Sequence, residues 1–278
     1  MPELPEVEAV RRGLESLVID KTIQDIEILW PRIIDTELDL QQWKLELIGQ
    51  TIHKMQRRGK YLIFVLSQGS LISHLRMEGK YLYYPKDQLS IEINKHSHVL
   101  FKFTDGSQLH YNDVRKFGRL HLLANHAWPN YFDNKSLGPE PLSDDFKLST
   151  FIENLSKSQR NIKPLLLDQK VVVGLGNIYV DESLFLAKIH PLRKASSLES
   201  EEIESLYHAI KKVLDQAVRE GGSTIRTYKN SLGEAGKFQQ SLNVYGKNGK
   251  PCSRCGQEID KIKVSQRGTH YCPYCQVL

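Results

Sequence analysis

The sequence predicts an α+β fold, in which an N-terminal antiparallel β-sandwich flanked by helices precedes a helical part that ends in a zinc-bound β-hairpin. Short strand-like segments separated by turn signals fill residues 51–125. Apolar residues recur at helical spacing beyond residue 145, and all four cysteines lie between Cys252 and Cys275. Separate runs of strands and helices are typical of α+β proteins, and 278 residues suggest about two domains.

The N-terminal helix is predicted to begin near Leu4, because apolar residues recur at helical spacing: Val7, Val10, Leu14 and Leu17. Pro5 suits the first turn of a helix, where a backbone N–H has no partner. Glu6 and Glu8 favour the positive end of the helix dipole. We expect this helix to pack its apolar face on the sandwich.

Seven short strands are predicted after this helix. They are Thr51–Gln56, Tyr61–Leu66, Leu71–Leu75, Tyr81–Tyr84, His98–Phe103, Gln108–Asn112 and Arg119–Leu123. Turn signals separate several of them, as at Gln68-Gly69, Glu78-Gly79 and Asp105-Gly106. Short strands at this spacing are typical of an antiparallel sandwich.

A segment rich in proline, glycine and polar residues, 134–145, marks a boundary. We expect a sandwich domain over 1–132, a linker over 133–145, a helical domain over 146–240 and a metal-binding segment over 241–278. Four helices are predicted in the second half, the last of them ended by Gly221-Gly222: Phe146–Leu155, Ile162–Leu167, Ile178–Ala187 and Glu201–Arg219.

The first six residues place a reactive amine beside two carboxylates, Glu3 and Glu6. If Met1 is removed, which a small second residue permits, Pro2 carries a secondary amine that can attack an electrophilic carbon and form an iminium. An α-amino group has a pKa of about 8 against about 10.4 for lysine, so roughly a tenth of it is nucleophilic at neutral pH. A retained Met1 would make the Pro2 nitrogen an unreactive amide. A role for Pro5 and Glu6 as helix start is compatible with this chemistry.

The four cysteines form two C-x-x-C pairs, Cys252 with Cys255 and Cys272 with Cys275. Two such pairs around a short strand-like segment predict one structural zinc ion held by four thiolates, with no open position for catalysis. His270 is then not a ligand. The alternative of two disulfides is disfavoured, because we expect no signal peptide, no membrane span and a reducing cytosol. We expect no organic cofactor.

Basic residues cluster beside turns, and the formal net charge is +5. The clusters are Arg57-Arg58-Gly59-Lys60, His74-Leu-Arg76, Arg115-Lys116-Phe117-Gly118 and Gln266-Arg267-Gly268. Cations on short loops are well placed to bind phosphates, although each cluster alone also fits a solvated hairpin end. Gly174-Leu-Gly176-Asn177 predicts a tight turn that brings a phosphate to the following helix N-terminus. Asp181 and Glu182, early in that helix, are residue types that suit metal or acid-base chemistry, but we expect them only to complement the helix dipole.

Several motifs together resemble the bacterial formamidopyrimidine-DNA glycosylases, which are 8-oxoguanine DNA glycosylases and AP lyases of base-excision repair. The resemblance covers essentially the whole chain. It is carried by Pro2-Glu-Leu-Pro-Glu6, Arg58-Gly-Lys60-Tyr-Leu, His74-Leu-Arg-Met77-Glu-Gly-Lys80, Asp113-Val-Arg115-Lys-Phe117-Gly, Gly174-Leu-Gly-Asn177-Ile-Tyr and Gln266-Arg267-Gly-Thr-His270-Tyr-Cys272. It implies a sandwich domain, a helix-two-turn-helix DNA-binding domain and a zinc hairpin.

The resemblance also implies residue roles. Pro2 would attack the sugar C1′ of an extruded lesion nucleotide, Glu3 would relay protons, and Lys60 and Arg267 would complete the catalytic centre. Lys60, Arg267, His74 and Asn177 would bind phosphates. The residues expected at the lesion or in the emptied base stack are Glu6, Met77, Arg115, Phe117, Lys163 and Tyr228, the last within a loop over Ser223–Tyr228. Periodicity alone would place Met77 in the core.

By the same resemblance, the partner is double-stranded DNA with an oxidised base, preferably opposite cytosine. The iminium would lead to β,δ-elimination and cut the strand on both sides. We expect a monomer, because no heptad seam is present, and a cytoplasmic, nucleoid-associated bacterial protein. One alternative is an endonuclease VIII-like enzyme for oxidised pyrimidines, which Leu4 disfavours because that branch tends to carry glycine there. Another is a non-catalytic damage-binding protein, which would gain nothing from Pro2.

Overall fold

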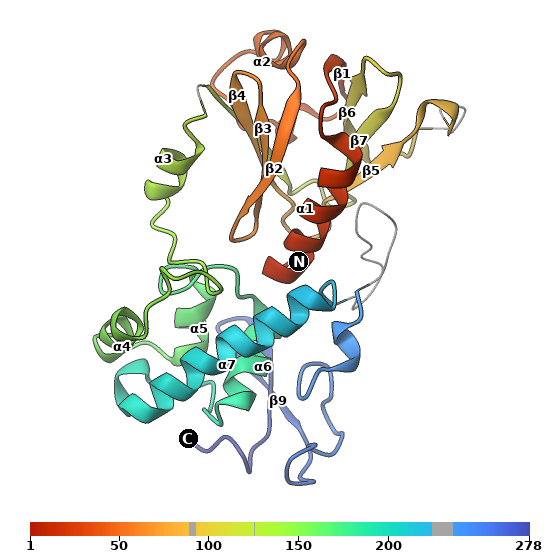
Figure 1. Ribbon diagram of the computed structural model, residues 1–278. Coiled ribbons are helices and arrows are strands. Elements are labelled where there is room, and N and C mark those ends of the chain that lie inside the picture. Colours follow the sequence, from red (N-terminus) through yellow and green to blue (C-terminus); the bar gives the residue numbers. More distant parts are fainter. Residues whose placement is uncertain (89–92, 125, 224–235) are drawn as a thin grey trace. The chain divides into compact units, whose positions relative to one another are not determined.

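The computed structural model of the chain describes residues 1–88, 93–124, 126–223 and 236–278 (Figure 1). The chain divides into two compact units. The first contains residues 1–135 and 223–236, and the second contains residues 136–222 and 237–278. Each unit has an apolar core of its own. Among the described residues, no helix is both long and apolar enough to cross a membrane.

Two four-stranded antiparallel sheets build the first unit (Figure 1). One has the order β1-β6-β7-β5, made by Ile23–Ile28, Ser97–Phe103, Gln108–Asn112 and Lys80–Tyr84. The other has the order β2-β3-β4-β8, made by Ile52–Arg58, Tyr61–Leu66, Gly69–His74 and Arg119–Ala124. A single core cluster takes side chains from both sheets, so they pack face to face, and the predicted fold class is confirmed.

All seven predicted strands are present, with ends that differ by at most two residues. The sequence predicts no element for residues 19–50, where the structure has strand β1, the 3-10 helix Pro31–Ile33 and helix α2, Leu40–Leu47. The pairing of β1 with β6 shifts register between Ile23 and Asp25. That bulge breaks the apolar alternation by which strands are predicted, because Ile23, Ile26 and Ile28 are not two residues apart throughout.

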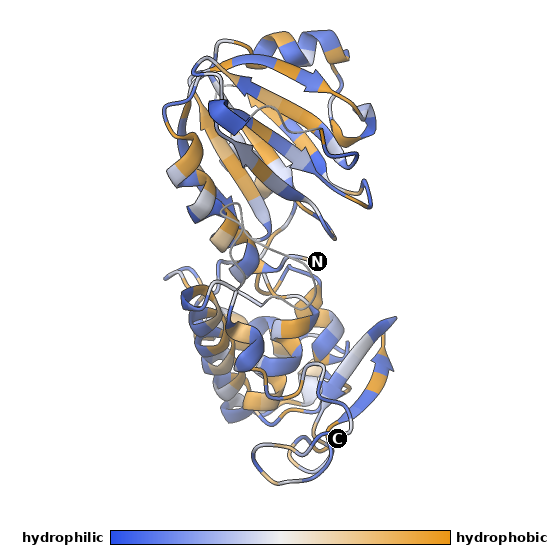
Figure 2. Cartoon of the chain, turned by 90° about the vertical axis from the view of Figure 1, so that its right-hand side faces the viewer, coloured by the Kyte–Doolittle hydropathy of each residue, from blue (hydrophilic) through white to orange (hydrophobic). Residues whose placement is uncertain are grey.

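Helix α1, Leu4–Val18, covers the sandwich as predicted. Four of its side chains are in the core: Val7, Val10, Leu14 and Val18. Figure 2 shows apolar residues in orange and polar residues in blue, and the two kinds alternate along the strands. Short elements complete the first unit: the 3-10 helices Pro31–Ile33 and Lys86–Gln88 and the helix α3, Trp128–Asp133.

The second unit is helical, as predicted. Its helices are α4 Leu148–Ser156, α5 Ile162–Leu167, α6 Asn177–Leu186 and α7 Ser200–Arg219, with 3-10 helices at Ala195–Ser197 and Phe238–Gln240. Gly221 and Gly222 have φ of 75° and 80°, and the Gly222 N–H donates to the Ala217 carbonyl at 2.8 Å, which ends α7. The hairpin of β9, Asp260–Val264, and β10, Arg267–Tyr271, follows.

Candidate functional site

The head of helix α1 is held by two buried carboxylates. Glu3 is the N-cap residue, and its side chain accepts a hydrogen bond from the backbone N–H of Glu6. The Glu6 carboxylate in turn accepts the Glu3 N–H at 2.8 Å. Glu3 and Glu6 are only 3% and 4% exposed. This reciprocal capping box provides acceptors for two backbone N–H groups at the start of the helix and so fixes the backbone of the first residues.

Glu6 also holds a distant part of the same unit. Its Oε1 accepts the Ser223 backbone N–H at 2.7 Å and the Ser223 hydroxyl at 3.2 Å. Each carboxylate oxygen of Glu6 therefore has a defined donor, one from the helix start and one from the segment that follows α7. No local sequence pattern could have joined two residues that are 217 positions apart.

The α-amino group of the chain lies where burial lowers its pKa below the ordinary value. The carboxylates of Glu3 and Glu6 oppose this shift, whereas the charge of Lys60 adds to it. In the full sequence this amine belongs to Met1, while Pro2 behind it is buried.

Lys60 stands in the two-residue turn between β2 and β3 and is 7% exposed. Gly59, the first residue of the turn, has a φ of 56°, which glycine adopts without strain. The turn places a buried cation close enough to the head of α1 to interact with its amine.

His74 ends strand β4 and is held as a neutral imidazole. Its Nδ1 accepts the Arg76 backbone N–H at 2.9 Å, so the ring proton is on Nε2. Burial, followed by the charges of Arg76 and Lys60, lowers the pKa of His74 to about 3. The ring therefore offers a phosphate one uncharged N–H donor.

The loop that contains Arg115 and Phe117 is built on a fully buried carboxylate. Asp113 accepts the backbone N–H groups of Arg115 at 3.0 Å, Phe117 at 2.9 Å and Gly118 at 2.8 Å. Phe117 is 49% exposed, and the Arg115 guanidinium lies 4.7 Å from the centre of its ring. An exposed aromatic side chain on a loop whose backbone is fixed is suited to insertion between bases.

Met77 is half-buried in the turn after β4, so the prediction from periodicity that it lies in the core is wrong. Strand β4 is buried at every residue and ends at His74, so its buried run does not reach Met77. The Tyr111 hydroxyl packs close to Gly79 in this turn and to Gly118 in the Phe117 loop. A Cβ on Gly79 would approach it to 2.3 Å, and one on Gly118 to 1.6 Å. Only glycine fits at both positions, a requirement that the sequence does not signal.

In the second unit, Asn177 is the first residue of α6. Its side-chain amide donates to the Gly268 carbonyl at 2.8 Å and so ties the helix start to the β9–β10 hairpin. Arg267 is exposed at the start of β10, directly after a turn in which Ser265 and Gln266 have φ of 44° and 64°. Positive φ at both central residues is the mark of a type I′ hairpin turn.

Lys163 is fully buried in α5. Its ammonium lies 2.6 Å from the Asp181 Oδ1 and 3.4 Å from the Gly268 carbonyl, and both side chains of the pair are 0% exposed. Asp181 Oδ2 accepts the His270 N–H at 2.9 Å. Lys163, which the resemblance places near a lesion, is therefore buried inside the second unit and hydrogen-bonded to the β9–β10 hairpin.

Asp181 and Glu182 do more than complement a helix dipole, so that expectation is wrong. Glu182 is 1% exposed and accepts the backbone N–H groups of Asn243, Val244 and Tyr245 at 2.8–2.9 Å. These carboxylates satisfy buried backbone donors that lie far away in the sequence.

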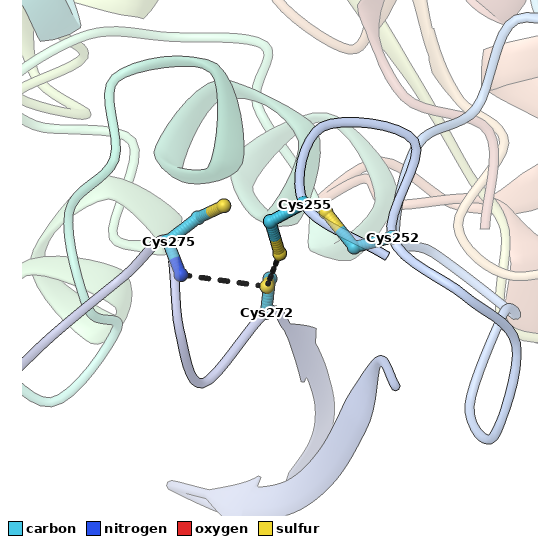
Figure 3. Close-up of side chains that lie close together, drawn as sticks. All are labelled: Cys252, Cys255, Cys272 and Cys275. Carbon is cyan, nitrogen blue, oxygen red and sulfur yellow. Dashed lines mark hydrogen bonds between the residues drawn. The ribbon is translucent and has the colours of Figure 1, made fainter. Parts of the chain in front are cut away.

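The four cysteines converge as predicted (Figure 3). Their sulfur atoms all lie within 4.8 Å of one another, and the Sγ atoms of Cys255 and Cys272 are 3.5 Å apart. Four thiolates around one zinc ion, with bonds of about 2.3 Å, would have sulfurs about 3.8 Å apart. The cluster therefore fits one structural zinc ion. Backbone N–H groups of Arg254 and Cys275 point at the Cys252 and Cys272 sulfurs, as expected around a charged thiolate cluster.

Each unit thus carries a set of the predicted site residues. The first has Pro2, Glu3, Glu6, Lys60, His74, Met77, Arg115 and Phe117. The second has Lys163, Asn177, Arg267 and the four cysteines. Tyr228 lies outside the described residues.

Comparison with known proteins matches three successive segments of the chain to family models. Residues 1–120 match the formamidopyrimidine-DNA glycosylase N-terminal domain, residues 137–229 its H2TH domain, and residues 249–277 the zinc finger found in FPG and IleRS. The formamidopyrimidine-DNA glycosylase of Enterococcus faecalis is 59% identical over 279 aligned residues, which cover 100% of this chain and 98% of the relative.

Solved structures agree. The chain matches a variant of Lactococcus lactis FPG bound to Fapy-dG-containing DNA with a TM-score of 0.94 at 50% identity, over 100% of both chains. It matches the Lactococcus lactis Fpg bound to abasic-site DNA with a TM-score of 0.92 at 49% identity, over 99% of this chain and 100% of that one. With matches of this extent, the chain belongs to the formamidopyrimidine-DNA glycosylase family.

Proposed function

We propose that this enzyme excises oxidised purines, 8-oxoguanine and formamidopyrimidines, from duplex DNA and then cuts the strand at the resulting abasic site. The observation that carries the proposal is the head of α1, where Pro2 is buried beside the buried carboxylates of Glu3 and Glu6. The family matches over the whole chain support the same chemistry.

In the proposed reaction, removal of Met1 frees the secondary amine of Pro2. The nitrogen lone pair attacks C1′ of the damaged nucleotide, the bond from C1′ to the base breaks, and the base leaves with a proton. Glu3 relays that proton and the one that opens the sugar ring. The resulting iminium acidifies the neighbouring sugar protons, so successive β- and δ-eliminations expel the two flanking phosphates. Pro2 is the nucleophile and Glu3 the proton relay.

Lys60, His74, Asn177 and Arg267 are proposed to bind the phosphates that flank the lesion. Arg267 is exposed, and His74 has a neutral donor, so both are suited to this role. Each side chain would contact sugar-phosphate and carry no base preference of its own. Lys163 is proposed to support the Arg267 hairpin through Gly268.

Base extrusion costs a few kcal/mol and leaves a gap in the stack. Met77 and Phe117 are proposed to fill the gap, and Arg115 to donate to the orphaned cytosine, which would favour lesions opposite cytosine. Glu6 is proposed to position the extruded nucleotide. Tyr228 is proposed to lie in the loop that covers the base. The enzyme is proposed to act as a monomer on chromosomal DNA in the bacterial cytoplasm.

The test is borohydride trapping on a duplex with one 8-oxoguanine opposite cytosine, with strand cleavage followed in parallel. Protein processed at Met1 is compared with protein that retains Met1 and with Pro2→Gly, whose amine is primary. We expect an adduct that maps to Pro2 in the processed protein and none with Met1 retained. Tight binding with neither adduct nor cleavage would instead support a damage-binding protein. A second duplex that carries an oxidised pyrimidine is assayed in the same way, and cleavage of that duplex alone would support the endonuclease VIII-like alternative.

A further inference from the structure

Glu8, in the second turn of α1, is the centre of a cluster of guanidinium groups. Its carboxylate accepts hydrogen bonds from Arg11 at 3.0–3.2 Å, from Arg12 at 2.9 Å and from Arg57 at 3.1 Å. Arg11 and Arg12 belong to the same helix, whereas Arg57 belongs to strand β2 and is 49 positions away. The Glu8–Arg57 pair therefore joins two elements, as does the Arg11 bond to the Met55 carbonyl of β2 at 3.3 Å, whereas the Arg12 bond to Glu8 stays within the helix.

Arg57 extends this link into the turn that carries Lys60. While its Nε binds Glu8, its Nη1 donates to the Gly59 carbonyl at 2.9 Å. Gly59 and Lys60 are the two residues of the β2–β3 turn. One planar guanidinium thus connects the helix to the residue directly before Lys60, a geometry that the single ammonium of a lysine cannot reproduce.

The pair is shielded and charged. Glu8 and Arg57 side chains are each 14% exposed, whereas Arg12 is 56% exposed. Burial alone would raise the pKa of Glu8, but hydrogen bonds from Arg11 and the charges of Arg57 and Arg11 hold it below the usual range. An ion pair with little solvent around it restrains geometry better than an exposed pair does.

We infer that Glu8 and Arg57 are positioning residues, which hold the Lys60 turn at a fixed place relative to the amine at the head of α1. The inference rests on the proposed function, because it assumes that this amine and Lys60 act on the same nucleotide. A misplacement of about 1 Å in a catalytic group can lower a rate about 100-fold while leaving binding nearly intact. The expected signature is a loss of rate without an equal loss of affinity.

The experiment uses full-length, zinc-loaded protein processed at Met1. Single-turnover borohydride trapping on an abasic-site duplex gives the rate, and titration of a tetrahydrofuran-containing duplex gives the Kd. The variants are Arg57→Ala, Glu8→Gln and the charge swap Glu8→Arg with Arg57→Glu. Arg12→Ala is the matched control, because it removes a guanidinium from Glu8 without breaking the link to the turn.

We expect Arg57→Ala and Glu8→Gln to trap about 10- to 100-fold more slowly, with the Kd changed less than about threefold. Arg12→Ala should stay within about twofold in both, and the swap should recover part of the rate. Unchanged trapping in Arg57→Ala and Glu8→Gln would overturn the inference. So would a parallel loss of rate and affinity, or an equal defect in Arg12→Ala.

Two controls keep the outcomes separate. If the unaltered protein traps no DNA, the proposed function fails and the variants are not needed to show it. If it traps DNA but Arg57→Ala is unfolded by circular dichroism, Glu8→Gln decides, because it keeps the shape of the side chain. A folded Glu8→Gln with an unaltered trapping rate would refute the positioning role while leaving the proposed function intact.

Discussion

Replacing Lys163 by methionine should strongly destabilise the second unit. Lys163 and Asp181 are both fully buried, with 2.6 Å between the ammonium and the carboxylate. Methionine has nearly the same length, so the main effect is an Asp181 charge that has lost its partner. Breaking a buried pair by removing one partner costs about 3–5 kcal/mol. With a urea m-value of about 2 kcal/mol per M, the unfolding midpoint should fall by roughly 1.5–2.5 M.

The tryptophans make the assay specific for one unit. The chain has three, Trp30, Trp43 and Trp128, and all lie in the first unit. Their fluorescence therefore reports the first unit, while zinc release to a chromogenic chelator reports the second. In Lys163→Met we expect the zinc transition to move to lower urea and the tryptophan transition to change little.

A double variant tests the cause. Lys163→Met with Asp181→Asn removes the stranded charge, yet the asparagine carbonyl can still accept the His270 N–H. It should recover more than half of the lost stability, because a neutral amide costs less to bury than an unpaired carboxylate. A shift below about 0.5 M in Lys163→Met, or a double variant no more stable than the single one, would refute the reasoning.

Three further predictions concern other parts of the chain. Asp113→Ala leaves three backbone N–H groups without their acceptor, so the tryptophan-reported unfolding free energy should fall by about 3 kcal/mol or more, and a loss below about 1 kcal/mol would contradict the role of this carboxylate. His74 is neutral in the folded state down to a pKa of about 3, whereas the unfolded state takes up its proton near pH 6.5. Stability should therefore fall as the pH is lowered from about 6.5 toward 3, and His74→Gln should flatten that dependence in urea titrations. Chelation of zinc, or Cys272→Ser, should abolish binding to tetrahydrofuran DNA in a mobility-shift assay while the tryptophan transition stays in place, and binding that survives metal loss would count against a structural zinc ion.

The sequence predicted the elements whose patterns are local. Helix α1 has an apolar stripe of helical period, and seven strands alternate or lie between glycine turns, so propensity and burial agree there. The apolar residues of strand β1 do not alternate with polar ones, because the strand contains a bulge. Helix α2 buries two side chains, those of Trp43 and Leu47. Helix α2 did offer a signal that was missed, because Asp39 is its N-cap residue and Leu40, Trp43 and Leu47 stand at helical spacing.

The sequence points to candidate site residues only where their chemistry is concentrated in a motif. The four cysteines and the Pro2–Glu6 segment carry their chemistry in residue type and spacing. Lys163, in contrast, reads as a surface lysine beside a proline, and its partner Asp181 is 18 positions away. The link between Glu8 and Arg57 spans 49 positions. Pairs of this kind depend on tertiary packing, which one sequence does not display.

The bond from Ser223 to Glu6 has a consequence for any attempt to divide the protein. Because Ser223 belongs to the first unit and its neighbour Gly222 to the second, the polypeptide passes from one unit to the other three times, near residues 135, 222 and 236. One proteolytic cut or one stop codon therefore cannot yield two intact halves. A fragment that ends at residue 135 would lack the donors that Ser223 gives to Glu6 at the head of α1. Expression of the first unit alone would therefore require residues 223–236 to be joined to residues 1–135.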